Sequence, residues 1–310
     1  MKRILFFVTL LSVLVLNVPQ YAQAGIIADY KARVSESRQI KNTEKEIREV
    51  FKTQDKYTNS YDFDGLYRLY SDDFMNCDGY NKEVYFKLIK ETWETYPEIT
   101  YQTEIVNVNV TSNFATVETF ETAFAVTEED SEYISAVGEL RSEAHCIYHL
   151  KRDKGRWLIS GEDILDERSS LKYGDARFIK MELNAPTLIG AGQDYSAELK
   201  VDMPADQIVI ASIASEKIIQ PVEPAPERYR KLPSDQILER LFVANKDNVN
   251  EYSIASVGVT RTEPLDEENV KVYMNGLAFL MTRVNVVPKN NFIKMDEKPA
   301  VKDVKGGETK

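Results

Sequence analysis

One stretch, residues 138–167, constrains the fold most, because it has the pattern of a long β-hairpin. Two segments in which apolar and polar residues alternate flank a tight turn, Asp153–Arg156, and a period of two is typical of strands with one buried face. Gly155 can adopt the positive φ that such a turn requires. One face of the first strand should carry Leu140, Ser142, Ala144, Cys146, Tyr148 and Leu150, and the other should carry both histidines, His145 and His149.

The region before this hairpin has the pattern of three helices and further strands. Thr43 and Glu46 form a capping box at the start of an amphipathic helix. A short helix is expected over residues 63–70, and a third should run from Asn81 until Pro97 ends it. Strands are expected over residues 74–78, 101–110 and 114–126. This order predicts an α+β domain whose helices cover one face of a bent antiparallel sheet.

Four short segments within about residues 40–170 point to a known superfamily. They are residues 64–74 (DGLYRLYSDDF), the turn at Gly79, residues 114–117 (FATV) and residues 155–159 (GRWLI). In this order they resemble the nuclear transport factor 2-like superfamily, the cone-shaped, cystatin-like fold shared with ketosteroid isomerase and the SnoaL-like polyketide cyclases. The resemblance implies a pocket between the concave face of the sheet and the helices.

The resemblance also implies the kind of catalytic group to look for, an inward carboxylate base with a tyrosine and a neutral acid as hydrogen-bond donors. If Ala115 and Val117 point inward, the alternation continues to Glu121. Glu121 is therefore the candidate base, and apolar surroundings would raise its pKa. Alternatively, Glu121 lies at a strand end and reaches solvent. The candidate ligand-binding residues are Tyr70, Tyr85, Trp93, Glu121 and Tyr148.

No metal site or cofactor is expected. His145 and His149 share a strand face but lie roughly 13 Å apart at the usual rise per residue, too far for one metal ion. We expect both to be solvated. The carboxylates between Asp62 and Asp73 lack the alternating register and terminal glutamate of a calcium-binding loop.

The first 24 residues have the pattern of a signal peptide. Lys2 and Arg3 precede the apolar run 4–16, and residues 22–24 (AQA) supply a cleavage motif. We therefore expect an exported protein, periplasmic or secreted, with no membrane span after cleavage. The formal net charge of −11 argues against a nucleic-acid partner and against docking on anionic lipids.

Export makes the cysteines informative, since the chain has two, Cys77 and Cys146. An oxidising compartment permits a disulfide between them. A free, buried thiol at Cys146 fits its core-like strand face equally well.

The chain after residue 170 has a different pattern, with short strands separated by turn residues. This layout predicts a smaller β-sandwich, immunoglobulin-like in arrangement. A helical piece is expected over Asp235–Phe242, and residues 270–287 form one strand or two that meet near Asn275. We therefore divide the chain into a signal peptide (1–24), an N-terminal extension (25–41), a nuclear transport factor 2-like domain (42–170), a β-sandwich domain (171–293) and a disordered charged tail (294–310).

Phe120 and Phe124 should lie on the sheet face opposite Glu121, where a second copy of the chain or the following domain would cover them. A reversed register would instead put them in the core. Because no acid/base partner of Glu121 is evident, the sequence favours an exported non-catalytic binding or assembly protein, whose cone binds a small apolar ligand or a protein partner. An isomerase or cyclase that uses Glu121 is the alternative, and a cone filled by its own aromatic side chains is a third reading.

Overall fold

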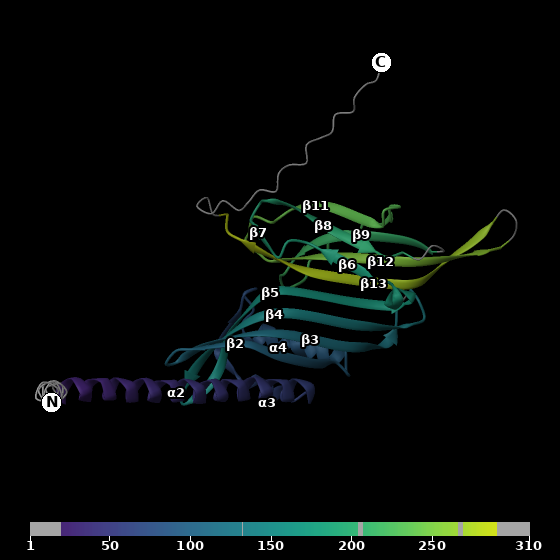
Figure 1. The fold of residues 1–310 in the computed structure, drawn as a ribbon. Helices are drawn as coiled ribbons and strands as arrows, with labels where there is room; N and C mark the ends of the chain where they lie inside the picture. Colours follow the sequence, from purple (N-terminus) through teal and green to yellow (C-terminus); the bar gives the residue numbers. More distant parts are fainter. Residues whose placement is uncertain (1–19, 132, 204–206, 266–268, 290–310) are drawn as a thin grey trace, which may run out of the picture.

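The computed structural model describes residues 20–289, except 132, 204–206 and 266–268. Within this part the chain is mostly antiparallel sheet with few helices (Figure 1). Most strands join one ten-stranded sheet, ordered β10-β9-β12-β13-β5-β4-β3-β2, with β1 beside β5 and β7 beside β13. The N-terminal half of the chain supplies the helices and one end of this sheet.

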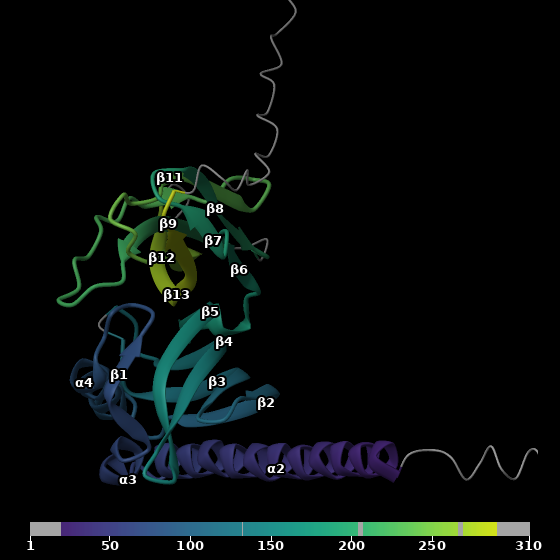
Figure 2. The ribbon, with the colours of Figure 1, turned by 90° about the vertical axis from the view of Figure 1, so that its left-hand side faces the viewer.

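Three helices accompany the N-terminal part of the sheet: α2 (Gln20–Asn59), α3 (Phe63–Tyr67) and α4 (Lys82–Thr95). The first is longer than predicted, because the helix runs through Thr43 without a break. Asn81 caps α4 by accepting a hydrogen bond from the Val84 amide (3.0 Å), and the helix ends before Pro97. Figure 2 shows α2 running below the sheet and past its edge strand β2 at the right, while α4 and β1 lie at the left of the sheet.

The cone consists of these helices and five strands. The strands are β1 (Tyr70–Asn76), β2 (Thr100–Val110), β3 (Phe114–Asp130), β4 (Val137–Asp153) and β5 (Arg156–Gly174). The β4–β5 turn has φ of 46° at Lys154 and 83° at Gly155, as the sequence predicted for a tight hairpin. Side chains from the helices and from the inner faces of the strands form one core, which includes Ile47, Phe51, Phe74, Phe86 and Tyr148.

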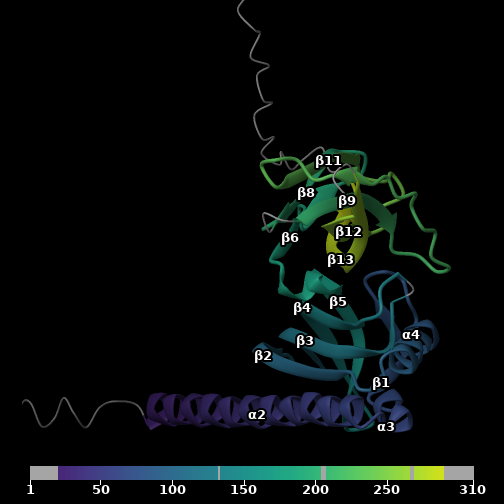
Figure 3. The same ribbon diagram turned by 90° about the vertical axis from the view of Figure 1, so that its right-hand side faces the viewer.

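The C-terminal part has two layers of strands with a second core between them (Figure 3). One layer is the three-stranded sheet β11-β8-β6, and the other is formed by β9, β12 and β13 of the large sheet. The strands and the short helix of this part are η1 (Asp175–Phe178), β6 (Met181–Asn184), β7 (Leu188–Gly190), β8 (Asp194–Val201), β9 (Gln207–Lys217), β10 (Arg230–Lys231), β11 (Ile237–Val243), β12 (Glu251–Pro264) and β13 (Val270–Val287). Because β5 pairs with β13, the sheet continues from the cone into this second part.

Two local predictions for this part need correction. The helix expected over Asp235–Phe242 is wrong, because β11 pairs along its whole length with β8, and alternate residues Leu238 and Phe242 pack on the core. Residues 270–287 form a single strand. Its pairing with β12 shifts by one residue at Asn275, which marks a β-bulge rather than a turn.

The two predicted terminal segments lie largely or wholly outside the described residues. These are the signal peptide 1–24, of which 20–24 belong to α2, and the charged tail 294–310. Among the described residues, no helix is both long and apolar enough to cross a membrane.

Candidate active site

The inner face of β3 carries a carboxylate toward the helices. Val117 and Thr119 are fully buried, and Glu121, two residues further on the same face, is half-buried opposite Ala144 of β4. The Thr119 hydroxyl donates to Glu121 Oε1 at 3.0 Å. The structure therefore places Glu121 on the inside of the cone, at a point where solvent still reaches it.

A second carboxylate, Glu162 of β5, lies in the same interior and was missed from the sequence. Strict alternation after Ile159 would turn residue 162 outward. The pairing of β4 with β5 shifts by one residue around Ser160, however, and Glu162 comes to lie opposite Tyr148. Glu162 is only 5% exposed. This β-bulge reverses the parity of the following residues until a second register shift at Leu165, and the local sequence pattern does not indicate either shift.

The hydrogen bonds of Glu162 are incomplete. Tyr85 donates its hydroxyl to Glu162 Oε1 at 3.3 Å, whereas the buried Oε2 has no hydrogen-bond partner. An unsatisfied buried carboxylate oxygen is costly, and the cost falls when the group is protonated or when a ligand meets it.

The surroundings shift the pKa values of both carboxyls upward. Burial, followed by the charge of Glu121, raises the pKa of Glu162 to about 8. Burial also raises the pKa of Glu121, although hydrogen bonds with Tyr148 and Thr119 oppose the shift. At neutral pH Glu162 is therefore mostly a neutral acid that can donate a hydrogen bond, and it lies beside a second carboxyl that can accept a proton.

Three tyrosines line the two carboxyls. Burial raises the pKa values of Tyr70, Tyr85 and Tyr148 well above the ordinary value, and the nearby carboxylate charges add to the effect. All three are therefore neutral phenols that can donate hydrogen bonds. The hydroxyl of Tyr70 also accepts a hydrogen bond from the Gln54 side chain at 3.1 Å.

Aromatic rings pack against one another in the core of the cone. Phe74 lies 4.9 Å from Tyr85 between ring centroids, and Phe51 lies 5.2 Å from Tyr148. Trp93, the other predicted ligand-binding residue, packs on the same core, but its ring meets Tyr61 edge-on at 5.3 Å. Of the five predicted residues, Glu121 is thus one member of the carboxyl pair, the three tyrosines lie around that pair, and Trp93 belongs to a neighbouring aromatic contact.

The histidines lie on the outer face and have separate partners. His145 Nε2 is 2.8 Å from Glu118 Oε1, and His149 Nε2 is 2.7 Å from Asp163 Oδ2. Each forms a pair with its own surface carboxylate. In the part of the chain that the structure describes, no group of three or more His, Cys, Asp or Glu side chains could hold a metal ion.

The disulfide between Cys77 and Cys146 is not formed, and both are free cysteines. Cys77 directly follows β1 and donates its amide hydrogen to the backbone carbonyl of Glu162 in β5 (2.8 Å), while Cys146 lies on β4, on the far side of β5. Two strand spacings amount to roughly 10 Å, beyond the reach of a disulfide. Spacing along the chain could not reveal that a strand would separate the two thiols.

Phe120 and Phe124 lie on the outer face of β3 and are 49% and 39% exposed. Phe120 contacts the His145 ring, with 4.5 Å between centroids, and the Arg141 guanidinium lies over Phe124 at 5.0 Å. The structure places both rings on the surface and not in the core.

Comparison with known proteins gives likenesses in structure only. No family model matches the sequence, and no curated protein is significantly similar to it. Solved structures similar to about 40% of the chain are nuclear transport factor 2-like (NTF2-like) and SnoaL-like proteins. A member of the NTF2-like family from Streptomyces avermitilis is 13% identical, with 40% of this chain and 95% of that chain covered and a TM-score of 0.32.

Two other solved structures are similar over the same share of the chain. A conserved protein from Planctomyces limnophilus is 19% identical, covering 39% of this chain and 94% of that chain, with a TM-score of 0.34. The hexachlorocyclohexane dehydrochlorinase LinA-type3 from Novosphingobium barchaimii is 12% identical, covering 40% of this chain and 85% of that chain, with a TM-score of 0.33.

Proposed function

We propose that the cone binds a small, largely apolar ligand and catalyses the transfer of a proton from one of its carbon atoms. This is the chemistry of the isomerases and cyclases that the sequence resembles. The observation that carries this proposal is the pair of carboxyls, the half-buried Glu121 and the buried Glu162, which share one interior with three neutral tyrosines. Two neighbouring carboxyls whose surroundings give them different pKa values are a recurrent arrangement in acid/base catalysis.

The geometry suggests a role for each group. Glu121 is half-buried and would act as the base, taking a proton from carbon beside a ligand carbonyl. The protonated Glu162 would donate a hydrogen bond to the oxygen on which negative charge develops, and Tyr85 would orient Glu162 by donating its hydroxyl hydrogen to Oε1. The aromatic walls would favour an apolar ligand over a charged one.

A non-catalytic binding role is the second candidate, because the close packing of the cone restricts the access of a ligand to the carboxyls. Phe51, Phe74 and Phe86 are each 1% exposed, so a ligand has to reach the carboxyls from the side on which Glu121 is open. In this role the carboxyls and tyrosines would only orient a ligand or a protein partner.

Proton transfer can be tested by exchange of ligand hydrogens for deuterium. Purified protein is incubated in D₂O with a panel of small apolar ketones, and exchange beside the carbonyl is followed by NMR. We expect exchange that falls at least about 100-fold in Glu121→Gln, since a positioned base contributes roughly 10²–10⁴-fold. Glu118→Gln, on the outer face of the same strand, is the matched control.

The outcomes separate the two candidates. Ligand binding by the wild type without exchange would contradict catalysis and leave the binding role. Exchange that Glu121→Gln does not reduce would remove Glu121 as the base.

The proposal extends to the whole chain in three respects. The N-terminal pattern supports export, and a mature chain that still begins at Met1 would contradict it.

The second part, residues 171–293, would act as a β-sandwich module of assembly. The exposed rings of Phe120 and Phe124 would be covered by a second copy of the chain, which a monomer at all concentrations in sedimentation would contradict.

A further inference from the structure

A cavity of about 510 Å³ lies where the cone meets the second part of the chain, apart from the carboxyl pair. Its lining comes from both sides: the turn after β1, one residue of α4, the segment after β9 and the segment before β12. Its volume is within the range of small-molecule sites. The lining residues used below are Asp78, Tyr80, Val84, Gln220, Asn248 and Asn250.

Internal hydrogen bonds hold both walls in place without a ligand. In the turn after β1, Asn76 Oδ1 accepts from the amides of Asp78 (3.0 Å) and Tyr80 (2.9 Å). On the opposite wall the Ile218 amide donates to Asn250 O at 2.8 Å. The cavity is therefore preformed, which spares a ligand the cost of ordering its site.

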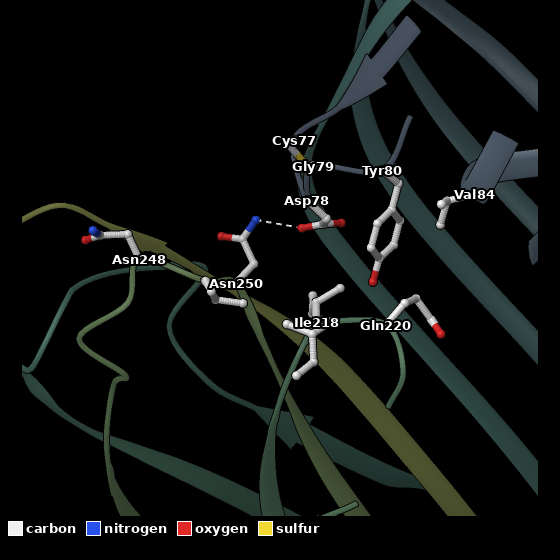
Figure 4. Close-up of a pocket in the computed structure, with 11 residues that line it drawn as sticks. Cys77, Asp78, Gly79, Tyr80, Val84, Ile218, Gln220, Asn248 and Asn250 are labelled. Atoms are coloured by element: carbon white, nitrogen blue, oxygen red, sulfur yellow. Dashed lines mark hydrogen bonds between the residues drawn. The ribbon is translucent and has the colours of Figure 1, made fainter. Parts of the chain in front are cut away.

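The cavity carries no free charge. The Asp78 carboxylate accepts a hydrogen bond from the Arg283 guanidinium, whose Nη1 lies 3.1 Å from Oδ2. It also accepts one from the Asn250 amide, whose Nδ2 lies 2.7 Å from Oδ1, and Figure 4 shows this second bond. Arg283 is itself fully buried. Burial raises the pKa of Tyr80, so its phenol is neutral as well. A charged ligand would find no counter-charge here, whereas a neutral polar ligand pays a smaller desolvation cost, which hydrogen bonds to the lining can offset.

The polar groups still available are side chains, not backbone. The amides of residues 77, 78, 79, 80, 218 and 219 are all used within the walls, so an extended peptide would find few main-chain partners here. The side-chain amides of Gln220 and Asn248 are exposed. Gln220 forms a hydrogen bond with the Tyr80 side chain, so the remaining capacity of Gln220 and the whole amide of Asn248 can donate to and accept from a ligand. Apolar surface from Val84, Ile218, Ile219 and Val249 lies beside them.

We infer that this cavity binds an uncharged saccharide of about the size of a disaccharide. Sugar hydroxyls donate and accept at once, which matches amide and phenol side chains, and the C–H faces of the ring match the valine and isoleucine surface. The site is independent of the proton-transfer chemistry proposed for the cone, since its lining shares no residue with the carboxyl pair.

The test is a binding titration of the purified full chain with maltose and with N,N′-diacetylchitobiose, followed by saturation-transfer NMR. Val84→Trp places a large side chain in the cavity, and Val106→Trp makes the same change on the exposed outer part of β2. We expect at least one disaccharide to bind, Val84→Trp to weaken it at least tenfold, and Val106→Trp to leave it unchanged.

A second variant keeps the test valid if Val84→Trp does not fold. Asn248 has a φ of 57°, which glycine also adopts, so Asn248→Gly removes the amide and keeps the backbone. We expect it to weaken the same disaccharide at least threefold at an unchanged unfolding temperature. Failure of both disaccharides to bind would overturn the inference. So would binding that neither cavity variant weakens, or tighter binding of glucose 6-phosphate or of an uncharged blocked tripeptide.

Discussion

At the scale of single residues, Glu162 links the candidate site to the stability of the fold. Its pKa in the folded protein is about 8 against an ordinary value of 4.5, so the folded state binds more protons than the unfolded state between these values. The contribution of the Glu162 carboxyl to the free energy of unfolding is therefore fully present below pH 4.5, and it is lost as the pH rises toward 8.

We expect Glu162→Gln, which is neutral at every pH, to remove much of this dependence. The wild type should lose on the order of a few kcal/mol of unfolding free energy between pH 4.5 and 9, and the variant clearly less. Urea unfolding at several pH values measures the difference, with Glu118→Gln as the control. Parallel pH profiles for wild type and Glu162→Gln would show that the buried carboxyl is not held neutral.

At the scale of elements, the strands and the turn of the β4–β5 hairpin could be predicted from the sequence. Which residues lie on its inner face could be predicted only in part. Its alternation and Gly155 specify two strands and a tight turn, because both signals are local. Alternation also placed Thr119 and Glu121 on the inner face of β3, since no bulge interrupts β3 there in its pairing with β4. In β5 the bulge at Ser160 exchanges the two faces, so Glu162 could not be found by counting.

The turn itself gives a second prediction for this element. Gly155 has φ of 83° and would place an added Cβ in open space, so the cost of Gly155→Val is backbone strain alone. We expect a loss of about 1–3 kcal/mol in unfolding free energy. Lys154→Asn, which suits the positive φ at that position, should leave stability unchanged or raise it slightly. Equal stability of wild type and Gly155→Val by thermal unfolding would contradict this turn geometry.

At the scale of the whole molecule, Arg283 of β13 connects the two parts of the chain. Its side chain is fully buried, forms an ion pair with Asp78 after β1, and lies 3.8 Å from Glu167 of β5. Arg283→Met leaves the buried Asp78 carboxylate and the partly buried Glu167 carboxylate without their counter-charge, and we expect a loss of about 3–5 kcal/mol.

A surface ion pair provides the comparison. Arg261 and Asp175 are both partly exposed, so Arg261→Met should cost less than about 1 kcal/mol. Asp78→Asn combined with Arg283→Met should recover part of the larger loss, since it removes one orphaned charge. Chemical unfolding measures all three variants, and similar losses for Arg283→Met and Arg261→Met would contradict the connecting role.

The sequence by itself determined the local features of the cone: the strands β2 to β5 and the β4–β5 turn, the α+β order, and the inward position of Glu121. These depend on periodicity and turn chemistry, which neighbouring residues carry. Only the tertiary structure decided which residues meet across strands: Glu162 beside Glu121, β5 between Cys77 and Cys146, β13 beside β5, and the cavity at Asp78. Pairing between distant segments and the position of a bulge are properties of the assembled sheet, and no local pattern encodes them.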